Sequence, residues 1–443
     1  MEDTKRIYQF NNKRVWITNK DVDLLHLVWK HRVVSLSQVQ FFLRHKYQDK
    51  EMAIYQKLLK WHNINIITTE AYTDGNTPYK CVRIAKNGLE ILKSEGVVVT
   101  PSYNYKNVKI PKHATADHFF GTREVIIRLM LIAEKKGFST FDSIPPSELP
   151  YNNQEEVKAM EQHVTPGAKL TPMVIPDWIV FSEKAILNIE SDTGSEFSEA
   201  IIEKVKRYVQ YVEQGLESID HHVLIVPPDS KDDDILCYVK SPPKDRSKRV
   251  GTLKDYIMRV SAHLVPNLHF HVVSSSRSGK VAYDILSGNY MNHSELATKI
   301  VDAFRVNRSL ADEVVEVEPG EIYPPNIEQA MYADKQLIIK KKEGTSKLVL
   351  VKVMDEGSVK SLDELSFLNY VVENNLLGRE IDEVLAVYAT DDELYTDTLG
   401  ERWNLKKILF TSLQQLNKNG KSGAAFYRST KPLKKSRCSL YEG

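Results

Sequence analysis

The sequence predicts a mixed α/β protein with several domains. Two patterns indicate this class: three short helices followed by a two-stranded hairpin in the first hundred residues, and later a strand, a hairpin partner, a helix and another strand. The chain length agrees with this prediction. A chain of 443 residues with a hydrophobic fraction of 42% can form two to four domains with buried cores.

Composition excludes several classes of protein. No apolar run approaches the roughly 18 residues that a membrane helix needs, and the start of the chain, MEDTKRIYQF, lacks the apolar segment of a secretory signal. The three cysteines (Cys81, Cys237 and Cys438) lie far apart, with no cysteine or histidine at metal-binding spacing. This argues against a disulfide framework and a zinc finger, and favours a reducing compartment. A cytoplasmic location with no membrane partner is expected.

The net charge of +1 conceals an uneven distribution of charge. Residues 1–112 hold 19 Lys and Arg against 10 Asp and Glu, and residues 416–443 hold seven basic residues and one acidic residue. Residues 312–328 instead carry six acidic residues and no basic residue. Basic ends suit a polyanionic partner such as DNA. The alternative is ordinary solvated surface charge.

The first hundred residues have the element order of a winged helix-turn-helix. Helical periodicity is followed by a β-rich run with a turn at Asp74–Gly75–Asn76, and a last helix begins near Lys86. The three helices before the hairpin are expected at residues 19–31, 35–44 and 49–62, with Ile54, Leu58 and Trp61 of the third facing inward.

In a winged helix-turn-helix the third helix enters the major groove and the hairpin, or wing, touches the DNA backbone. Gln56 is the one candidate on this helix for a bidentate contact with a base. The alternative is a protein-interaction module, since lysine is common on any exposed helix. The candidate DNA-binding residues are Lys46, Tyr47, Lys50, Gln56, Lys57, Lys60, Lys80 and Arg83.

The middle of the chain contains the pattern with most chemical content. A helix is expected at residues 116–136, after a basic linker. VIPDWIVFS and AILNIESDTGS then read as two strands joined by a turn at Ser182–Lys184, followed by a helix over 196–214 and a buried strand, HHVLIVPP. This is the core order of the PD-(D/E)xK nucleases, so a nuclease-like mixed sheet is predicted.

Nucleases of this type need two carboxylates that hold Mg²⁺ and a lysine that steadies the developing charge. Asp177 and Glu190 stand at the two acidic positions and would be the metal ligands. The usual lysine is replaced by Asp192, but Lys204 lies in an inward-facing stripe of the next helix and could supply the missing ammonium group. The candidate catalytic residues are therefore Asp177, Glu190, Asp192 and Lys204. The alternative is a structural network of ion pairs.

The arrangement resembles the replication-relaxation family of bacterial plasmid and phage proteins, over roughly residues 15–230. The resemblance rests on the N-terminal winged helix, the helix that contains His118, and the segments PDWIVF, ILNIESDTGSE and EKVKRY. The family's acid-x-Asp followed by a Lys-x-x-x-Tyr helix is matched by Glu190, Asp192, Lys204 and Tyr208. The resemblance implies a bacterial protein of plasmid or phage DNA replication, or of DNA relaxation, and leaves strand cleavage open.

A degenerate second copy of the nuclease-like core is expected near the C-terminus. Sliding the sequence by 163 residues superimposes Asp355 and Gly357 on Asp192 and Gly194, and the later segment EVLAVYATDD parallels HVLIVPPDSKDD. The same slide puts Val353 on Glu190 and Phe367 on Lys204, so the second copy is expected to be inert. The alternative is the general similarity of any strand–turn–helix–strand unit.

The boundaries follow composition and proline or glycine content. Strands are expected at FHVVSSS and KVAYDIL, within the first nuclease-like domain. The predicted divisions are 1–97 (winged helix), 98–112 (basic linker), 113–306 (nuclease-like domain), 307–330 (acidic connector), 331–429 (second, degenerate domain) and 430–443 (mobile basic tail).

Two further functions remain alternatives to a replication protein that binds double-stranded DNA. One is a winged-helix transcriptional regulator whose C-terminal part binds a partner or associates with itself. The other is a structural component of a replisome or partition complex. A tyrosine-based relaxase is not favoured, because its metal-binding histidine cluster is missing: His269 and His271 face one side of a predicted strand with no third histidine nearby.

Overall fold

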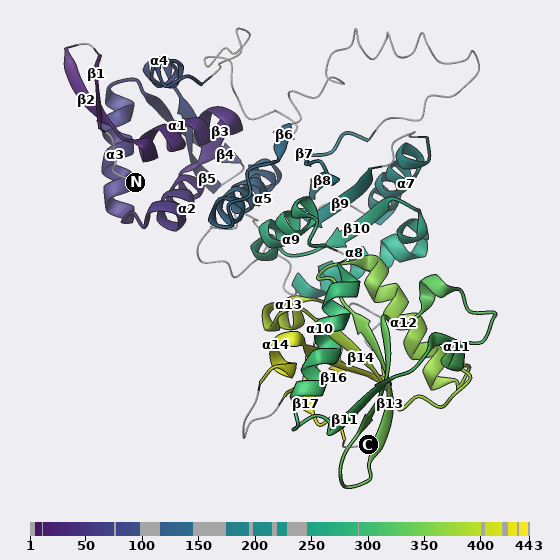
Figure 1. Ribbon diagram of the computed structural model, residues 1–443. Coiled ribbons are helices and arrows are strands. Elements are labelled where there is room, and N and C mark those ends of the chain that lie inside the picture. The colour runs from purple at the N-terminus through teal and green to yellow at the C-terminus, as the bar shows by residue number, and fades with distance from the viewer. Residues whose placement is uncertain are drawn as a thin grey trace, which may run out of the picture.

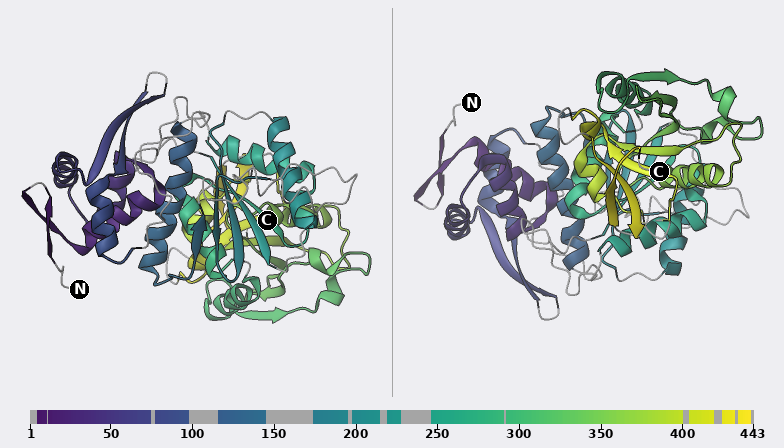
Figure 2. Two further views of the ribbon diagram at one scale, coloured as in Figure 1. Left: turned by 90° about the horizontal axis from the view of Figure 1, so that it is seen from above. Right: turned by 90° about the horizontal axis from the view of Figure 1, so that it is seen from below.

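The structure is a computed structural model of the whole chain (Figures 1 and 2). It is a mixed α/β protein with mixed sheets, as the sequence predicts. Among the described residues, no helix combines the length and hydropathy that a membrane span requires. The structure describes residues 5–10, 12–74, 77–97, 116–144, 174–194, 198–214, 219–227, 246–290, 292–399, 404–418, 424–431 and 434–441.

The N-terminal unit contains the expected helices and hairpin (purple in Figure 1). A strand between the first two helices, which the sequence reasoning did not predict, pairs with the hairpin to give the order β3-β5-β4. A further hairpin, β1-β2, was also not predicted. The elements are β1 (Arg6–Phe10), β2 (Lys13–Ile17), α1 (Asn19–His31), β3 (Val33–Ser35), α2 (Leu36–Tyr47), α3 (Glu51–Asn63), β4 (Ile67–Asp74), β5 (Thr77–Ile84) and α4 (Lys86–Ser94).

Local sequence signals explain these helix boundaries. The side chain of Ser35 accepts the amide of Gln38, and the Gln38 side chain accepts the amide of Ser35, which is a capping box. Ile54, Leu58 and Trp61 of α3 are buried as predicted, because their spacing puts them on one helix face.

The first α/β unit follows and is built on a five-stranded sheet of order β10-β9-β8-β7-β6 (Figure 1). β6, β7 and β8 are antiparallel neighbours, whereas β8, β9 and β10 run parallel. Helices α5 and α9 contact each other and cover one face, and α7 and α8 pack on the other. The elements are α5 (Ala116–Lys135), β6 (Asp142–Ile144), β7 (Trp178–Phe181), β8 (Ala185–Ser191), α7 (Ser198–Gln214), β9 (Asp220–Val226), α8 (Arg246–Arg259), η3 (Ala262–Leu264), β10 (Leu268–Val272) and α9 (Ser275–Ser287).

The prediction of a strand at KVAYDIL is wrong, because this segment lies inside α9. Val281, Ala282, Ile285 and Leu286 are buried against the first sheet. Their spacing fits one face of a helix, and the short apolar run alone did not distinguish a helix from a strand.

The second α/β unit has a seven-stranded sheet of order β11-β12-β13-β14-β15-β16-β17 (green to yellow in Figure 1). Its elements are α10 (His293–Val306), β11 (Glu313–Glu316), α11 (Pro319–Ile322), η4 (Gln329–Met331), β12 (Lys335–Lys340), β13 (Ser346–Val353), α12 (Val359–Glu373), β14 (Glu383–Tyr388), α13 (Asp391–Thr396), β15 (Ile408–Ser412), α14 (Leu413–Leu416), β16 (Phe426–Lys431) and β17 (Lys434–Cys438).

The two sheets share one topology. The sequence β6-β7-β8-α7-β9-β10 is repeated as β11-β12-β13-α12-β14-β15, with the same antiparallel and parallel pairings. Gly194 and Gly357, 163 residues apart, follow equivalent strands with φ of +77° and +79°. This left-handed conformation favours glycine. The structure therefore contains a repeated strand order, as the sliding of the sequence suggested.

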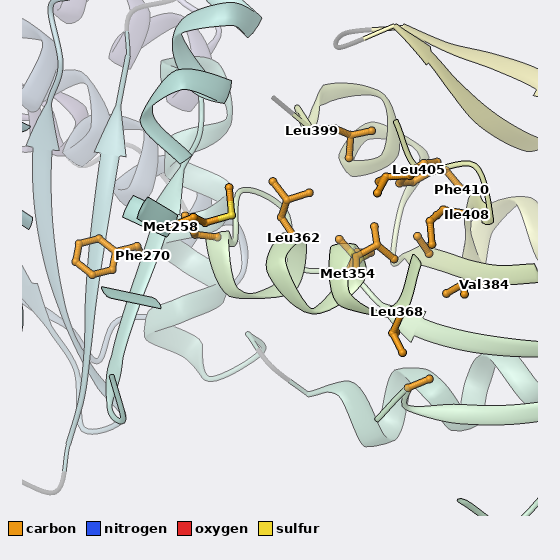
Figure 3. Close-up of a cluster of buried hydrophobic side chains, with 14 of the residues drawn as sticks. Met258, Phe270, Met354, Leu362, Leu368, Val384, Leu399, Leu405, Ile408 and Phe410 are labelled. Carbon is orange, nitrogen blue, oxygen red and sulfur yellow. The ribbon is translucent and has the colours of Figure 1, made fainter. Parts of the chain in front are cut away.

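The two α/β units share a continuous apolar core at their junction (Figure 3). Met258 and Phe270 of the first unit belong to the same buried cluster as Met354 and Leu362 of the second. In addition, the amide of Val272 at the edge of the first sheet donates to the carbonyl of Gly357 at 3.0 Å. The hydrophobic effect therefore stabilises the two units together.

The predicted divisions of the chain remain predictions, and the structure adds three facts about them. Helix α10, before the predicted boundary at residue 306, packs on the second sheet, and the acidic segment contributes the edge strand β11. The expectation of a mobile tail is wrong for its described part, since β17 pairs with β16 and Leu440 is buried. The predicted linker at residues 98–112 lies outside the described residues.

Candidate functional site

The candidate site lies where β7 begins and β8 ends. Trp178 of β7 is the register partner of Ile189 of β8, so Asp177, just before β7, comes opposite Glu190. The amide of Asp177 donates to the carbonyl of Ile189 at 3.1 Å, which extends the ladder to this point. The hairpin therefore brings the two predicted metal ligands to one end of the sheet.

Glu190 is buried, and two side chains from one face of α7 contact its carboxylate. Its Oε2 lies 3.2 Å from the Nζ of Lys204, and its Oε1 accepts the Tyr208 hydroxyl at 2.6 Å. Lys204 and Tyr208 are four residues apart and therefore neighbours on the helix surface. Burial and the Asp177 carboxylate raise the pKa of Glu190 to about 7, against the opposing effects of Lys204 and Tyr208.

Asp177 is held from two sides. Its Oδ2 accepts the amide of Ser191 at 2.8 Å and lies 2.9 Å from the Nε2 of His118, which comes from α5. Burial lowers the pKa of His118, but the hydrogen bond and charge of Asp177 outweigh this effect, so the pKa is raised overall. The sequence indicated His118 as part of the family resemblance but did not predict its contact with Asp177. No local pattern in α5 indicates that this residue contacts Asp177.

Asp192 has a different partner from the one expected. The Nε and Nη2 atoms of Arg249, on α8, each lie 2.6 Å from one oxygen of the Asp192 carboxylate. Such a bidentate pair is strong and directional. This contact does not support the prediction that Asp192 orients Lys204 or joins a metal site, and Arg249 was missed because it lies 57 residues further along the chain.

The donor set of the site suits Mg²⁺. Asp177 and Glu190 offer carboxylate oxygens, which are the ligands that this cation prefers. The Asp177 carboxylate contributes to the raised pKa of Glu190, and a divalent cation between the two acids would relieve that repulsion. The more exposed side of the site carries Lys204 and His118, whose side chains are about one third exposed. A polyanion could therefore approach from this side.

The eight predicted DNA-binding residues fall into two groups. Lys50, Gln56, Lys60 and Lys80 are exposed on or near α3 and β5. Lys80 also lies over the ring of Tyr55, with its Nζ 4.7 Å from the centroid. The remaining four residues contact carboxylates: Lys46 and Tyr47 contact Asp23, Lys57 contacts Asp21, and Arg83 contacts Glu70.

Residues 25–225 match the replication-relaxation family. The predicted resemblance is thereby confirmed, and the replication-relaxation match supports a replication-related function and an interaction with DNA. The matched range includes α2, α3 and the whole Asp177–Glu190–Lys204 cluster.

Two further comparisons add little. No curated protein matches the sequence. One solved structure with some likeness is the central domain of yeast acetyl-CoA carboxylase, at 10% identity and a TM-score of 0.17. The likeness covers 94% of this chain and 54% of that one, so the chain spans about half of its length. Such a TM-score supports no conclusion.

The second α/β unit carries charged residues at corresponding positions. Asp334 precedes β12 as Asp177 precedes β7, and its carboxylate accepts the amide of Val353 at 2.7 Å. The amide that Asp177 accepts likewise belongs to the residue after Glu190. Lys352 therefore occupies the position of Glu190, and the prediction that Val353 does so is wrong by one residue.

In the second unit the acidic and basic residues of the ion pair have exchanged places between strand and helix. The lysine stands on the strand, and its Nζ lies 2.7 Å from a carboxylate oxygen of Glu364 on α12. His293 lies 3.5 Å from Asp334 and 2.6 Å from Asp355. Burial opposes protonation of His293, but these two acids raise its pKa to about 10. The second unit therefore has no acid at the position of Glu190, although Asp334 stands at the position of Asp177.

The expectation that His269 and His271 have no third histidine nearby is wrong. His222, on the neighbouring strand β9, is the register partner of His269, and its Nδ1 lies 3.0 Å from the Nε2 of His271. The separation of 47 residues between the register partners hid this contact from a search for local spacing. The parallel pairing of two histidine-containing strands is the signal that could have revealed it.

Proposed function

We propose that this chain is a DNA-binding protein of plasmid or phage replication, or of DNA relaxation, with a nuclease-like acidic site in its first α/β unit. The observation that carries the proposal is the convergence of Asp177, Glu190 and Lys204 at one end of the β7-β8 hairpin. The order of the surrounding elements, helix–hairpin–helix–parallel strand, supports a PD-(D/E)xK-like core. The family match supports the setting in replication.

Asp177 and Glu190 would hold the Mg²⁺ ion in this proposal. Bound there, the ion would polarise a phosphate and lower the pKa of a water molecule. Lys204 would contact the negatively charged phosphate group, since its side chain is about one third exposed at the site. Tyr208 would hold Glu190 in place through its 2.6 Å hydrogen bond.

The site could either cleave DNA or bind DNA without cleaving it. Supercoiled plasmid incubated with Mg²⁺ or Mn²⁺ distinguishes them. Nicking that disappears in Glu190→Ala and persists in Glu203→Ala, an exposed acid on the neighbouring helix α7, supports cleavage. Nicking that survives Glu190→Ala rules this site out as its source.

The N-terminal unit would deliver the protein to duplex DNA. Its helix–strand–helix–helix–hairpin order supports a winged helix-turn-helix with α3 as the recognition helix. Lys50, Gln56, Lys60 and Lys80 are the candidates that remain exposed. The four residues that contact carboxylates are less available for phosphate contacts.

Fluorescence anisotropy with labelled duplex DNA tests this part of the proposal. Each phosphate contact contributes about −0.9 to the slope of log K against log salt, so Lys60→Ala with Lys80→Ala should reduce the slope by about 2. An unchanged slope would remove both residues from the interface. Absence of binding by the full chain at low salt would contradict the proposal as a whole.

A transcriptional regulator is the second candidate. The exposed face of α3 also carries Met52 and Leu59, whose exposed fractions are 70% and 46%. Exposed apolar side chains of this kind favour a protein partner for the N-terminal unit. A sharp footprint at a single promoter, with no dependence on divalent metal, would favour this function.

A further inference from the structure

Three histidines gather on one face at the edge of the first sheet. His222 lies on β9, and His269 and His271 lie on β10, the edge strand. Alternate residues of a strand point to the same face, and register partners on adjacent strands share that face. The ring of His222 stacks on both partners, with centroid distances of 4.8 Å to His269 and 5.2 Å to His271.

These histidines have the electronic form that metal ions require. Burial is the main cause that lowers the pKa of all three, which favours the neutral form of each imidazole. A neutral imidazole presents a lone pair on one ring nitrogen. An acidic group stands beside them, because the Oδ1 of Asp220 lies 3.7 Å from the Nε2 of His269.

We propose that Asp220, His222 and His269 bind a transition-metal ion of the zinc class. Their ligand atoms all lie within 4.8 Å of one another. Ligands at about 2.1 Å from a common zinc ion are separated by about 3.4 Å in tetrahedral geometry. The ligand atoms of the three residues must therefore move about an ångström closer together when the ion binds. Asp220 begins its strand and its side chain is 48% exposed, which leaves it room to move.

His271 supports the site without being a ligand. Its Nε2 faces the Nδ1 of His222 at 3.0 Å, and a hydrogen bond between these atoms can fix the His222 tautomer. If His222 donates in this bond, its Nε2 carries the lone pair that the ion needs. A partner that orients a metal-binding histidine in this way is a regular feature of such sites.

The location separates this site from the Asp177–Glu190 cluster. His222 and His269 lie near the starts of β9 and β10, whereas Glu190 lies near the end of the parallel strand β8. His269 also lines a cavity of about 400 Å³ together with Tyr290, His293 and Lys352. The cavity gives an ion a route of entry. Bound there, the ion would tie the edge strand β10 to β9 beside the junction of the two α/β units.

Titration of the full-length protein with Zn²⁺ tests the proposal, after treatment with a chelator. Isothermal titration calorimetry should detect a site whose affinity falls at least about tenfold in His269→Ala and in Asp220→Asn. Glu190→Ala and His62→Ala, the latter at an exposed position on α3, should retain that affinity. Co²⁺ in place of Zn²⁺ should give the visible absorption of a site with histidine ligands.

His222→Ala removes a buried side chain, so its folding is checked by circular dichroism. Asp220→Asn remains decisive in either case, because the Asp220 side chain is about half exposed and its replacement preserves shape. The proposal is overturned if the protein binds no Zn²⁺, or if Asp220→Asn and His269→Ala bind it as tightly as the unmodified chain. Loss of Zn²⁺ binding in Glu190→Ala would assign the ion to the other site and would equally overturn it.

Discussion

Glu190→Gln is expected to remove a pH-dependent cost of folding. Burial and the Asp177 carboxylate raise the pKa of Glu190 from 4.5 to about 7. Between these values the folded protein retains a proton that the unfolded chain releases, so the free energy of unfolding falls as the pH rises and the full cost is present above pH 7. At about 1.4 kcal/mol for each pH unit, the cost is about 3 kcal/mol at pH 8.

The side-chain amide introduced by Glu190→Gln has no proton to lose in this range, and its oxygen can still accept the Tyr208 hydroxyl. Hydrogen exchange of the β8 amides from pH 4.5 to 8, corrected for intrinsic exchange rates, reports the free energy of local opening. The unmodified protein should lose about 3 kcal/mol relative to Glu190→Gln across this range. Glu203→Gln, on the exposed side of α7, should follow the unmodified protein. Parallel profiles for the unmodified protein and Glu190→Gln would show that ionisation of Glu190 does not destabilise the fold.

Three further predictions follow from the same contacts. Arg249→Ala leaves the buried Asp192 carboxylate unpaired and should cost about 3 kcal/mol in urea titrations, with most of the loss recovered by adding Asp192→Asn; no recovery would contradict the pairing. Gly279→Ala places a Cβ within 2.9 Å of the α5 backbone and should destabilise the protein by about 1–3 kcal/mol, whereas Gly320→Ala meets open space; equal effects on the melting temperature would contradict this packing. Mg²⁺ affinity measured by calorimetry should rise with pH up to about 7, because Glu190 must release its proton to bind the ion, and a flat profile would exclude it as a ligand.

The N-terminal helices were predictable because their signals are local. Ser35 and Gln38 form a capping box three residues apart, and the buried face of α3 repeats every three or four residues. The strand β3 was not predictable in the same way. It has only three residues and exists through its pairing with β5, about fifty residues later.

The candidate site was predictable in part. The acids Asp177 and Glu190 stand next to recognisable strands, and Lys204 interrupts an apolar stripe, so their convergence followed from the order of elements. The partners of Asp177 and Asp192 were not predictable, because His118 and Arg249 come from helices 59 and 57 residues away along the chain. Tertiary packing alone brings those side chains to the acids.

The second unit shows the limit of sliding a sequence against itself. Gly194 and Gly357 align at a shift of 163 residues, but the hydrogen bonds of the preceding strands align one residue earlier. Apolar strand residues tolerate such a slip in a sequence comparison, whereas the hydrogen-bond ladder does not. The correspondence between Lys352 and Glu190 could therefore be recognised only from the strand register.

A crystal structure of the protein soaked with Mn²⁺ would show whether Asp177 and Glu190 bind one ion together. An anomalous density peak is expected between their carboxylates, with the Lys204 ammonium moved away from the Glu190 oxygen that it contacts. Carboxylates that stay bound to His118, Lys204 and Tyr208, with no peak between them at saturating Mn²⁺, would contradict this expectation and leave this cluster as a structural ion-pair network.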